Sequence, residues 1–304
     1  MSSLDLTVVA AEMSKAGVIV AEPDQLRTDG VLCRFSTNAH DKYRRRRDGW
    51  AVIFADGPRP VVAFGDWSRG ISESIVIGGG TRLSPAERER QRIAVEQSKA
   101  TRAYELRRRH AFAAVDAVRM WSQAGEASAD HPYLARKGVD AKGVRDYRGA
   151  ILVPMHDSKG SILNLQRIRA DGQKRFLRGG RVSGLYASIG TAGEHILLCE
   201  GWATGKSLNA VTALPVAVAF SSGNLYSVAV ELRRKYPSVK ITVCADNDAK
   251  PDGSNPGVKA ATAAAMAVAG HLAIPPTIGD FNDFIAANGG LDNPIEVLPS
   301  ERFT

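Results

Sequence analysis

Cysteine, aromatic residues and long apolar runs are all scarce in this chain of 304 residues. The three cysteines, Cys33, Cys199 and Cys244, share no metal-ligand spacing and are an odd number, which argues against a disulfide framework and fits a reducing cytoplasm. No run approaches the roughly 18 apolar residues of a membrane span. The N-terminus also lacks the basic segment and apolar core of a secretion signal. The sequence therefore predicts a cytoplasmic protein that does not engage a membrane.

What the chain does have is a globular composition and an excess of positive charge. Hydrophobic residues make up 44% of it, and the mean hydropathy is −0.16. A chain of this length is able to bury a sizeable core and to divide into two domains. Lysine and arginine exceed aspartate and glutamate by 40 to 32, and the net charge of +8 suits a polyanionic partner. A generally basic solvated surface would give the same balance, so the charge alone leaves both interpretations open.

Two short apolar runs each end in acidic residues. The run 196–199 is followed by Glu200, and the run 241–245 is followed by Asp246 and Asp248. Carboxylates at the carboxyl ends of buried strands in an open α/β sheet lie where such sheets bind ligands. Because acidic groups that converge there repel one another, a cation has to neutralise them, and Mg²⁺ or Mn²⁺ suits carboxylate ligands. The pattern predicts a metal site that supports phosphoryl transfer.

The last third of the chain alternates strand-like and helical segments. This alternation predicts an α/β domain, with a parallel sheet and helices on both of its faces. We expect strands at 195–199, 215–220, 239–245 and 271–274, separated by helices near 203–213, 225–236 and 256–269.

The segment after Glu200 raises a competing interpretation as a phosphate-binding P-loop, because Gly201 is followed by Gly205-Lys206-Ser207. That motif needs four residues between its first glycine and the Gly-Lys-Ser/Thr element, whereas three stand here. A strand that ends in glutamate is also foreign to a P-loop. We therefore reject the P-loop, although Lys206, near a helix N-terminus, is placed to approach phosphate.

The N-terminal part predicts a helix, a small β unit and then a long basic helix. Strand candidates at 50–54 and 60–64 flank a turn signal at 56–58. The long helix begins with a cap at Ser84 and continues to about Ala124 without glycine or internal proline. Its basic face either follows a phosphate backbone or is an ordinary solvated helix face.

The two carboxylate-tipped strands resemble the Toprim domain of bacterial-type primases, type IA and type II topoisomerases and some nucleases. The resemblance covers roughly residues 190–290 and rests on Glu200, with the glycine after it, and on the Asp-x-Asp pair Asp246 and Asp248, each at a strand end. It implies that these three acids are the catalytic residues and the ligands of Mg²⁺ or Mn²⁺.

A third acidic element, Gly279-Asp280-Phe281-Asn282-Asp283, resembles the motif that closes the Toprim domains of plasmid and phage primases. By resemblance, Asp280 and Asp283 are further metal ligands. Capping of the following helix by Asp280 and Asn282 would explain the same residues, and capping is compatible with a metal role.

The chain upstream resembles the catalytic-core subdomain that precedes Toprim in primases of mobile elements. The segments that carry this resemblance are His131-Pro132-Tyr133-Leu134-x-Arg136-Lys137-Gly138, Leu163–Ile168, Asp171–Leu177, Gly179–Arg181 and Gly184–Tyr186. In that family, basic residues of this subdomain face the metals and handle template and nucleoside triphosphate. Together with Lys206, the residues expected in this role are Arg167, Lys174, Arg175 and Arg178. A solvated basic hairpin is the alternative.

The N-terminal segment departs from that family. Its relatives commonly begin with a zinc ribbon of three cysteines and one histidine, whereas Cys33 and His40 alone are too few for a tetrahedral zinc site. We expect a metal-free, ribbon-like module that binds template DNA, and no zinc. A run of arginines with aromatic neighbours suits contacts to single-stranded nucleic acid, and a solvated loop is the alternative. The contacts expected are Arg44, Arg45, Arg46, Arg47, Trp50 and Trp67.

These features predict a metal-free module at 1–80, a basic helical linker at 81–125, a small α+β catalytic-core subdomain at 126–190 and a Toprim domain at 191–295. The resemblance implies a DNA primase, a nucleotidyltransferase that makes short RNA primers on single-stranded DNA from ribonucleoside triphosphates by two-metal chemistry, in plasmid or phage replication or conjugation. Any helicase partner would be a separate chain. The alternatives are a Toprim nuclease and a non-catalytic replication protein that binds single-stranded DNA. A topoisomerase would need large further domains.

Overall fold

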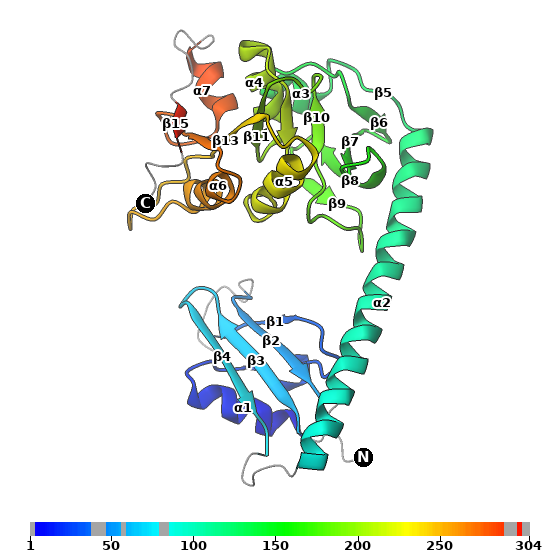
Figure 1. Ribbon diagram of the computed structural model, residues 1–304, viewed down its shortest axis with the longest axis vertical. Helices are drawn as coiled ribbons and strands as arrows, with labels where there is room; N and C mark the ends of the chain where they lie inside the picture. Colours follow the sequence, from blue (N-terminus) through cyan, green and yellow to red (C-terminus); the bar gives the residue numbers. More distant parts are fainter. Residues whose placement is uncertain (1–3, 38–46, 56–58, 79–84, 289–296, 300–304) are drawn as a thin grey trace. The chain divides into compact units, whose positions relative to one another are not determined.

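The computed structural model of the chain describes residues 4–37, 47–55, 59–78, 85–288 and 297–299. The chain divides into two compact units, Met1–Glu105 and Leu106–Thr304 (Figure 1). Both units combine helices with sheets, which confirms the mixed α/β fold class. Among the helices that are described, none is long and apolar enough to traverse a bilayer.

The first unit is a four-stranded antiparallel sheet that packs one face against a helix. Its strands follow chain order across the sheet: β1 (Cys33–Phe35), β2 (Gly49–Phe54), β3 (Val61–Asp66) and β4 (Ile71–Val76). The helix α1 (Leu6–Lys15) precedes them, with a short 3₁₀ helix, η1 (Pro23–Gln25), between. Val9 and Met13 of α1 pack in one core with Phe35, Ile53 and Phe64. Every second residue of β2 is buried, as expected for a strand with one face on a core.

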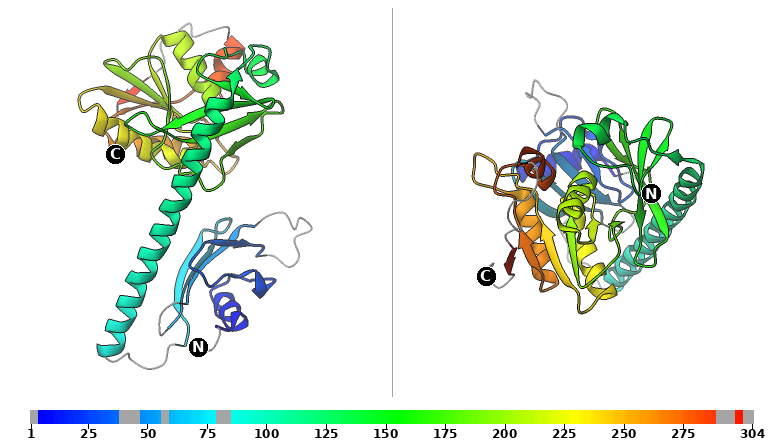
Figure 2. Two further views of the ribbon diagram at one scale, coloured as in Figure 1. Left: turned by 90° about the vertical axis from the view of Figure 1, so that its right-hand side faces the viewer. Right: turned by 90° about the horizontal axis from the view of Figure 1, so that it is seen from above.

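The strands predicted near 50–54 and 60–64 are confirmed within two residues, and the turn predicted at 56–58 lies outside the described residues. The long helix predicted from Ser84 to Ala124 is also confirmed, as α2 (Pro85–Gln123), although Ser84 itself is not among the described residues. Figure 2 shows α2 as one uninterrupted helix, in keeping with the absence of glycine and proline from 86 to 123.

A buried carboxylate ties the end of β3 to the loops beside it. Asp66 is 1% exposed and accepts hydrogen bonds from Thr37 Oγ1 (2.8 Å), Ser68 N and Oγ (2.9 and 2.6 Å) and Arg69 Nε (2.8 Å). Burial alone would raise the pKa of Asp66, but the bonds from Ser68, Thr37 and Arg69 outweigh it and hold the pKa well below its usual value. Asp66 is therefore a structural anchor of the first unit.

The second unit contains a five-stranded antiparallel sheet that also follows chain order. Its strands are β5 (Gly125–Glu126), β6 (Arg145–Tyr147), β7 (Ala150–His156), β8 (Ile162–Arg169) and β9 (Lys174–Phe176), and α3 (Pro132–Lys137) lies between β5 and β6 in sequence. The predicted hairpin of β7 and β8 is confirmed; Asp157 Oδ1 closes its turn by accepting bonds from Lys159 N (3.0 Å) and Ser161 N (2.9 Å). On one face of this sheet, Leu152 and Leu165 pack against Ala117 of α2.

The second unit also contains a six-stranded sheet with a parallel centre. Its strand order is β10 (Ala187–Ile189), β12 (Val216–Val218), β11 (His195–Cys199), β13 (Lys240–Cys244), β14 (His271–Ala273) and β15 (Val297–Pro299). The four central strands run parallel, which confirms the predicted sheet. The edge strands β10 and β15 are antiparallel to their neighbours and were not predicted from the sequence.

Helices cover both faces of the six-stranded sheet, as predicted. They are α4 (Trp202–Thr212), α5 (Ser222–Lys235), α6 (Pro256–Ala267) and α7 (Phe281–Asn288). Along β11, Leu197 faces the core that holds α4 and α7, while Ile196 and Leu198 face the core that holds α5 and α6. Burial on both sides explains why these strands read as unbroken apolar runs. The α4 core also takes in Ile151 and Ile168, so it joins the two sheets of this unit.

Gly205 allows close helix packing and does not form a phosphate-binding loop. The helix α4 begins at Trp202 with Gly201 as its N-cap, so Gly205 lies inside the helix and not in a loop. A Cβ at 205 would stand 2.7 Å from Cγ2 of Val218 and 3.0 Å from Cδ1 of Ile189. The glycine lets α4 lie close on the sheet, which agrees with rejecting the P-loop.

We expect Asp66→Asn to lower the unfolding free energy of the first unit by about 2–3 kcal/mol near neutral pH, because charge-assisted hydrogen bonds to a buried carboxylate are weakened. Folding depresses the pKa of Asp66, so its contribution is complete above the unfolded value of 3.8 and is lost as the pH falls below it. The difference between wild type and variant should therefore stay constant from about pH 7 to about pH 5 and shrink as the pH falls further.

Urea denaturation followed by tryptophan fluorescence measures this difference, since Trp50 and Trp67 both lie in the first unit. Asp24→Asn, at an exposed position, is the matched control. An equal loss in both variants would show that Asp66 is no anchor.

Candidate active site

The acids that follow β11 and β13 meet at one edge of the six-stranded sheet. These strands are parallel neighbours, with Leu198 opposite Val243, so their carboxyl ends lie side by side (Figure 1). Glu200 directly follows the first strand, and Asp246 and Asp248 follow the second. The topology thus brings together the three acids singled out in the sequence.

Glu200 and Asp246 are partly buried, and neither carboxylate is fully satisfied. Among the described residues, Glu200 Oε1 and Asp246 Oδ1 are buried atoms without a hydrogen-bond partner. Burial, reinforced by the charge of Asp248, raises the pKa of Glu200 to about 7, against a lowering effect of a backbone hydrogen bond from Ser222. Burial also raises the pKa of Asp246 to about 7, reinforced by Glu200, Asp280 and Asp248 and opposed by Lys174. The site holds more negative charge than its surroundings compensate.

This arrangement fits a hard divalent cation. Buried acceptors without donors are rare in folded proteins and call for an explanation such as an ion. Carboxylate oxygens are the ligands that Mg²⁺ takes, and a cation would relieve the mutual repulsion of Glu200, Asp246 and Asp248. In the described part of the chain no three acidic, histidine or cysteine side chains are already drawn together into a metal-binding group. The fit rests on the unsatisfied oxygens and on the charge.

Two asparagines that the sequence analysis missed fix the loop between Asp246 and Asp248. Asn247 exchanges backbone hydrogen bonds with Gly279 (2.9 and 3.0 Å), which anchors the loop to the segment before α7. Asn255 Nδ2 donates to Asn247 Oδ1 (2.9 Å), and Asn255 Oδ1 accepts from Asp248 N (3.1 Å). The middle residue of an Asp-x-Asp motif and the asparagine that caps α6 were the signals available in the sequence.

The first turn of α6 touches the same loop through a glycine. A Cβ at Gly257 would stand 2.3 Å from the backbone oxygen of Asp246 and 3.2 Å from Oδ2 of Asp248. Any side chain at 257 would displace the backbone that carries both acids. Gly257 is therefore a positioning residue of the site.

The three polar residues of the closing acidic motif, Asp280, Asn282 and Asp283, make different contacts. Asp280 Oδ1 accepts from Asp283 N (2.9 Å), so Asp280 caps α7 while its charge also acts on Asp246. Asp283 is paired with Lys137 Nζ at 2.8 Å. Asn282 is no cap: it is buried, and its Nδ2 donates to the backbone oxygen of Lys137 (2.9 Å) and to Ser207 Oγ (2.8 Å).

Of the basic residues expected beside the acids, the structure brings in Lys174. Lys174 stands opposite Ile168, which packs in the core next to the six-stranded sheet. Lys174 is exposed, yet desolvation by the surrounding protein and the nearby Lys137 lower its pKa, while Asp280 and Asp246 act to raise it. Its charge therefore lies at the acidic site.

The other expected basic residues lie elsewhere. Arg167 and Arg175 are opposite each other on β8 and β9, one residue out of phase with Lys174, and so occupy the face of the sheet that packs on α2. Arg178 lies in the exposed turn after β9. Lys206 is 6% exposed and paired with Asp140 at 2.6 Å. Contacts of these four with nucleotide or template stay a prediction.

In the first unit, aromatic and basic side chains gather on the sheet face opposite the core. The rings of Trp50 and Trp67 stack with centroids 5.9 Å apart, and the Arg34 guanidinium lies 4.8 Å from the Trp67 centroid. Gly65 stands opposite Trp50 and leaves room for its indole, since a Cβ there would lie 2.7 Å from Nε1. Arg47 is exposed next to this group and accepts Arg34 Nε through its backbone oxygen (3.0 Å), whereas Arg44, Arg45 and Arg46 lie outside the described residues, as does His40.

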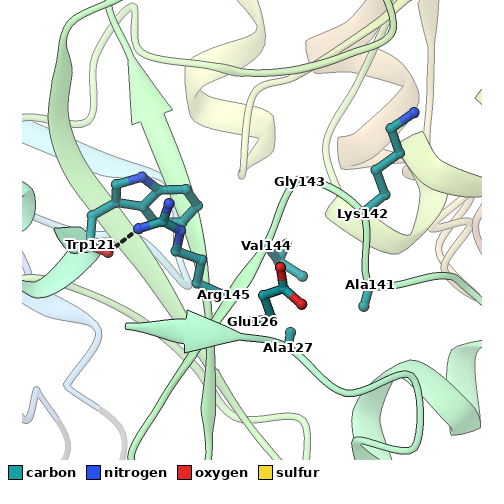
Figure 3. Close-up of a pocket in the computed structure, with 8 residues that line it drawn as sticks. All are labelled: Trp121, Glu126, Ala127, Ala141, Lys142, Gly143, Val144 and Arg145. Atoms are coloured by element: carbon teal, nitrogen blue, oxygen red, sulfur yellow. Dashed lines mark hydrogen bonds between the residues drawn. The ribbon is translucent and has the colours of Figure 1, made fainter. Parts of the chain in front are cut away.

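A pocket of about 400 Å³ lies apart from the acidic edge (Figure 3). Its lining includes Trp121, Glu126, Lys142 and Arg145 and none of the residues expected at the active site. Arg145 is already engaged with Trp121, donating to its backbone oxygen at 2.7 Å and lying 4.7 Å from its ring centroid. This pocket is therefore distinct from the acidic edge.

Curated proteins similar to this chain include two called DNA primase TraC, both from Escherichia coli. One is 31% identical and the other 29% identical, each over 207 residues. The matched stretch is 64% of this chain but 20% and 14% of those proteins, so the chain spans about a fifth or less of their length. Among solved structures, the RNA polymerase domain of the Mycobacterium tuberculosis primase DnaG is similar with a TM-score of 0.43 and 14% identity, over 66% of this chain and 85% of that one.

The part of the chain that carries the acids also matches a family model. Residues 195–290 match the model described as a Toprim domain. The match includes β11 and β13 with Glu200, Asp246 and Asp248 at their ends, and it closes with the motif of Asp280 and Asp283. The resemblance read from these residues is confirmed: residues 195–290 of this chain form a Toprim domain.

Proposed function

We propose that this chain is a DNA primase, a nucleotidyltransferase that extends a short RNA primer on single-stranded DNA. The observation that carries the proposal is the pair of buried carboxylate oxygens on Glu200 and Asp246 that have no hydrogen-bond partner among the described residues, at the ends of adjacent parallel strands of a Toprim domain. The similarity to proteins called DNA primase supports it further. In this proposal the parts act as a template-binding module at 1–80, a linker at 81–125, a nucleotide-handling subdomain at 126–190 and a catalytic domain at 191–295.

Glu200, Asp246 and Asp248 would hold the metal ions, with Asp280 near enough to contribute charge. Bound Mg²⁺ supplies activation of the primer 3′-hydroxyl and neutralises the leaving pyrophosphate. The chain itself orients these groups: the backbone of Ser222 holds Glu200, and Asn247 and Asn255 hold the loop that carries the aspartates. Phosphoryl transfer asks little covalent chemistry of a protein, so positioning and charge compensation carry the rate.

The stacked tryptophans of the first unit are proposed as the template contact. Trp67 is 51% exposed, its ring stacks with that of Trp50, and the Arg34 guanidinium lies 4.8 Å from its centroid. Exposed aromatic and cationic groups gathered in this way suit contacts to single-stranded nucleic acid. The exposed Arg47 adds positive charge beside it. This surface needs no zinc.

The activity is tested with single-stranded DNA, labelled ribonucleoside triphosphates and Mg²⁺ or Mn²⁺. We expect the wild type to make short oligoribonucleotides. Glu200→Ala and Asp246→Ala should each lower the rate of primer synthesis at least about 100-fold, because each removes a carboxylate ligand of the metal ions that stabilise the transition state. Glu194→Gln, an exposed acid before β11, is the control and should keep full activity. Shortening of the DNA would instead indicate a nuclease, and binding without product would indicate a non-catalytic DNA-binding protein.

The metal site is tested by stability. In EDTA we expect Asp246→Asn to be more stable than the wild type by about 1 kcal/mol, because it removes one of several repelling charges at a partly buried site. Mg²⁺ should raise the melting temperature of the wild type and raise that of the variant much less. Thermal unfolding with and without Mg²⁺ measures both, with the exposed Asp130→Asn as control. If Mg²⁺ at millimolar concentration did not change the melting temperature of the wild type, the proposed metal site would be rejected.

The template surface is tested by affinity. Trp67→Ala should weaken binding of a single-stranded oligonucleotide by about tenfold, the loss of one stacked base. Tyr226→Ala, also an exposed aromatic residue but in the second unit, should leave the affinity unchanged. Fluorescence anisotropy of a labelled oligothymidylate reports both; equal affinities for Trp67→Ala and the wild type would place the template elsewhere.

A further inference from the structure

The pocket drawn in Figure 3 lies beside the edge strand β5 of the five-stranded sheet. The strand β9, whose Lys174 brings its charge to the acids, forms the opposite edge of that sheet. The end of α2, the strand β5 and the segment 141–145 line the pocket. Its volume of about 400 Å³ falls in the range of roughly 300–1,000 Å³ that small-molecule sites occupy. The pocket is therefore large enough for a ligand of its own.

Two opposite charges line this pocket without pairing with each other. Glu126 of β5 and Arg145 of β6 stand directly opposite in the antiparallel ladder, so their side chains leave the same face of the sheet. Such cross-strand neighbours of opposite charge usually stabilise each other. Here Arg145 donates to the backbone oxygen of Trp121 (2.7 Å), and the exposed Glu126 carboxylate has no hydrogen-bond or ion-pair partner among the described residues. Figure 3 shows the guanidinium turned toward the indole and away from the carboxylate.

Trp121 holds the guanidinium in place. Its ring is partly buried against the core that contains Leu152, and the Arg145 guanidinium lies 4.7 Å from the ring centroid. The bond to the Trp121 oxygen uses one of the five N–H donors of a guanidinium, so Arg145 keeps donors for a ligand. On another wall, Ala141 and Gly143 contribute little or no side chain, which leaves room for a flat molecule. The pocket thus offers a fixed donor, a free acceptor and space for a planar body.

We propose that this pocket binds a guanine base, whose N1–H and N2–H donate to the Glu126 carboxylate and whose O6 and N7 accept from Arg145. Arginine binds this pair of acceptors in the commonest specific contact to a DNA base. An ionised carboxylate only accepts hydrogen bonds, so it suits the two donor groups on the neighbouring edge of guanine. Adenine, cytosine and thymine lack two donor groups beside two acceptors. A free guanosine nucleotide and a guanine within a single strand of DNA both present these groups.

Base recognition is tested by titration calorimetry of the full chain with mononucleotides, in EDTA so that no metal ion joins them to the acids. We expect GMP to bind to the wild type. IMP, which lacks the 2-amino group, should bind about tenfold more weakly, as for the loss of one hydrogen bond to a charged group. AMP should bind at least about 100-fold more weakly, because it satisfies neither Glu126 nor Arg145 in the same pose.

Glu126→Gln locates the binding in this pocket. The side chain is exposed and has no partner in the described structure, so the melting temperature should equal that of the wild type. The affinity for GMP should fall at least about tenfold and the preference over AMP should disappear, because an amide no longer supplies two acceptors to N1–H and N2–H. Glu194→Gln, also at an exposed acid of the second unit, is the matched control and should bind as the wild type does.

The two sources of the base are separated by fluorescence anisotropy with a labelled oligothymidylate and with the same strand carrying one central guanine. Tighter binding of the guanine strand by about tenfold, lost in Glu126→Gln, would identify a guanine within single-stranded DNA. A Glu126-dependent preference for GMP without any strand preference would identify a free nucleotide. If neither measurement showed a guanine preference that depends on Glu126, the proposed pocket ligand would be wrong.

Both measurements omit primer synthesis and are independent of the proposed function. A chain that makes no primers but prefers guanine through Glu126 would reject the primase activity and leave the pocket standing. A chain that makes primers while Glu126→Gln binds GMP and both strands as the wild type does would reject the pocket and leave the activity standing.

Discussion

Uncompensated negative charge at the ends of two adjacent parallel strands is the constraint on which the second unit depends. Glu200 and Asp246 are held partly buried with one oxygen each lacking a partner in the described structure, and burial raises the pKa of both to about 7. Such a site opposes folding, so apolar layers on both faces of the sheet have to supply the stability that it lacks. A cation that neutralises the acids relieves their mutual repulsion, and this relief strengthens its binding and stabilises the folded state.

The acids keep their places because small residues let the chain approach them closely. Gly257 admits the backbone of Asp246 to within a distance that no side chain would allow, and Gly205 lets α4 lie on the strands that end beside Glu200. Asn247 and Asn255 then hold the loop by hydrogen bonds between backbone groups and asparagine side chains. These bonds do not use the carboxylates of the aspartates. The surroundings of the site have to be rigid, because like charges repel one another and stay close together only in a stiff frame.

Much of the Toprim domain was predictable from the sequence, because strands buried on both faces read as short apolar runs and the acids stand at their ends. Contacts set by register or by distant segments were not. Arg175 follows Lys174 by one position in β9, and Arg167 stands opposite Arg175 in β8, so both arginines lie on the other face of the sheet from Lys174. Lys206 looked free to approach phosphate, yet Asp140, from another segment, pairs with it. The edge strands β10 and β15 also depend on neighbours remote in sequence.

Two buried aspartates show how surroundings divide structural from functional acids. Asp66 is the more deeply buried, yet donors from Thr37, Ser68 and Arg69 surround it and lower its pKa, so its charge is fully used within the first unit. Asp246 meets few donors and several like charges, and its pKa rises. Burial is common to both, and the difference lies in whether the fold supplies the hydrogen bonds. An acid that the fold buries without supplying hydrogen bonds is suited to bind a cation.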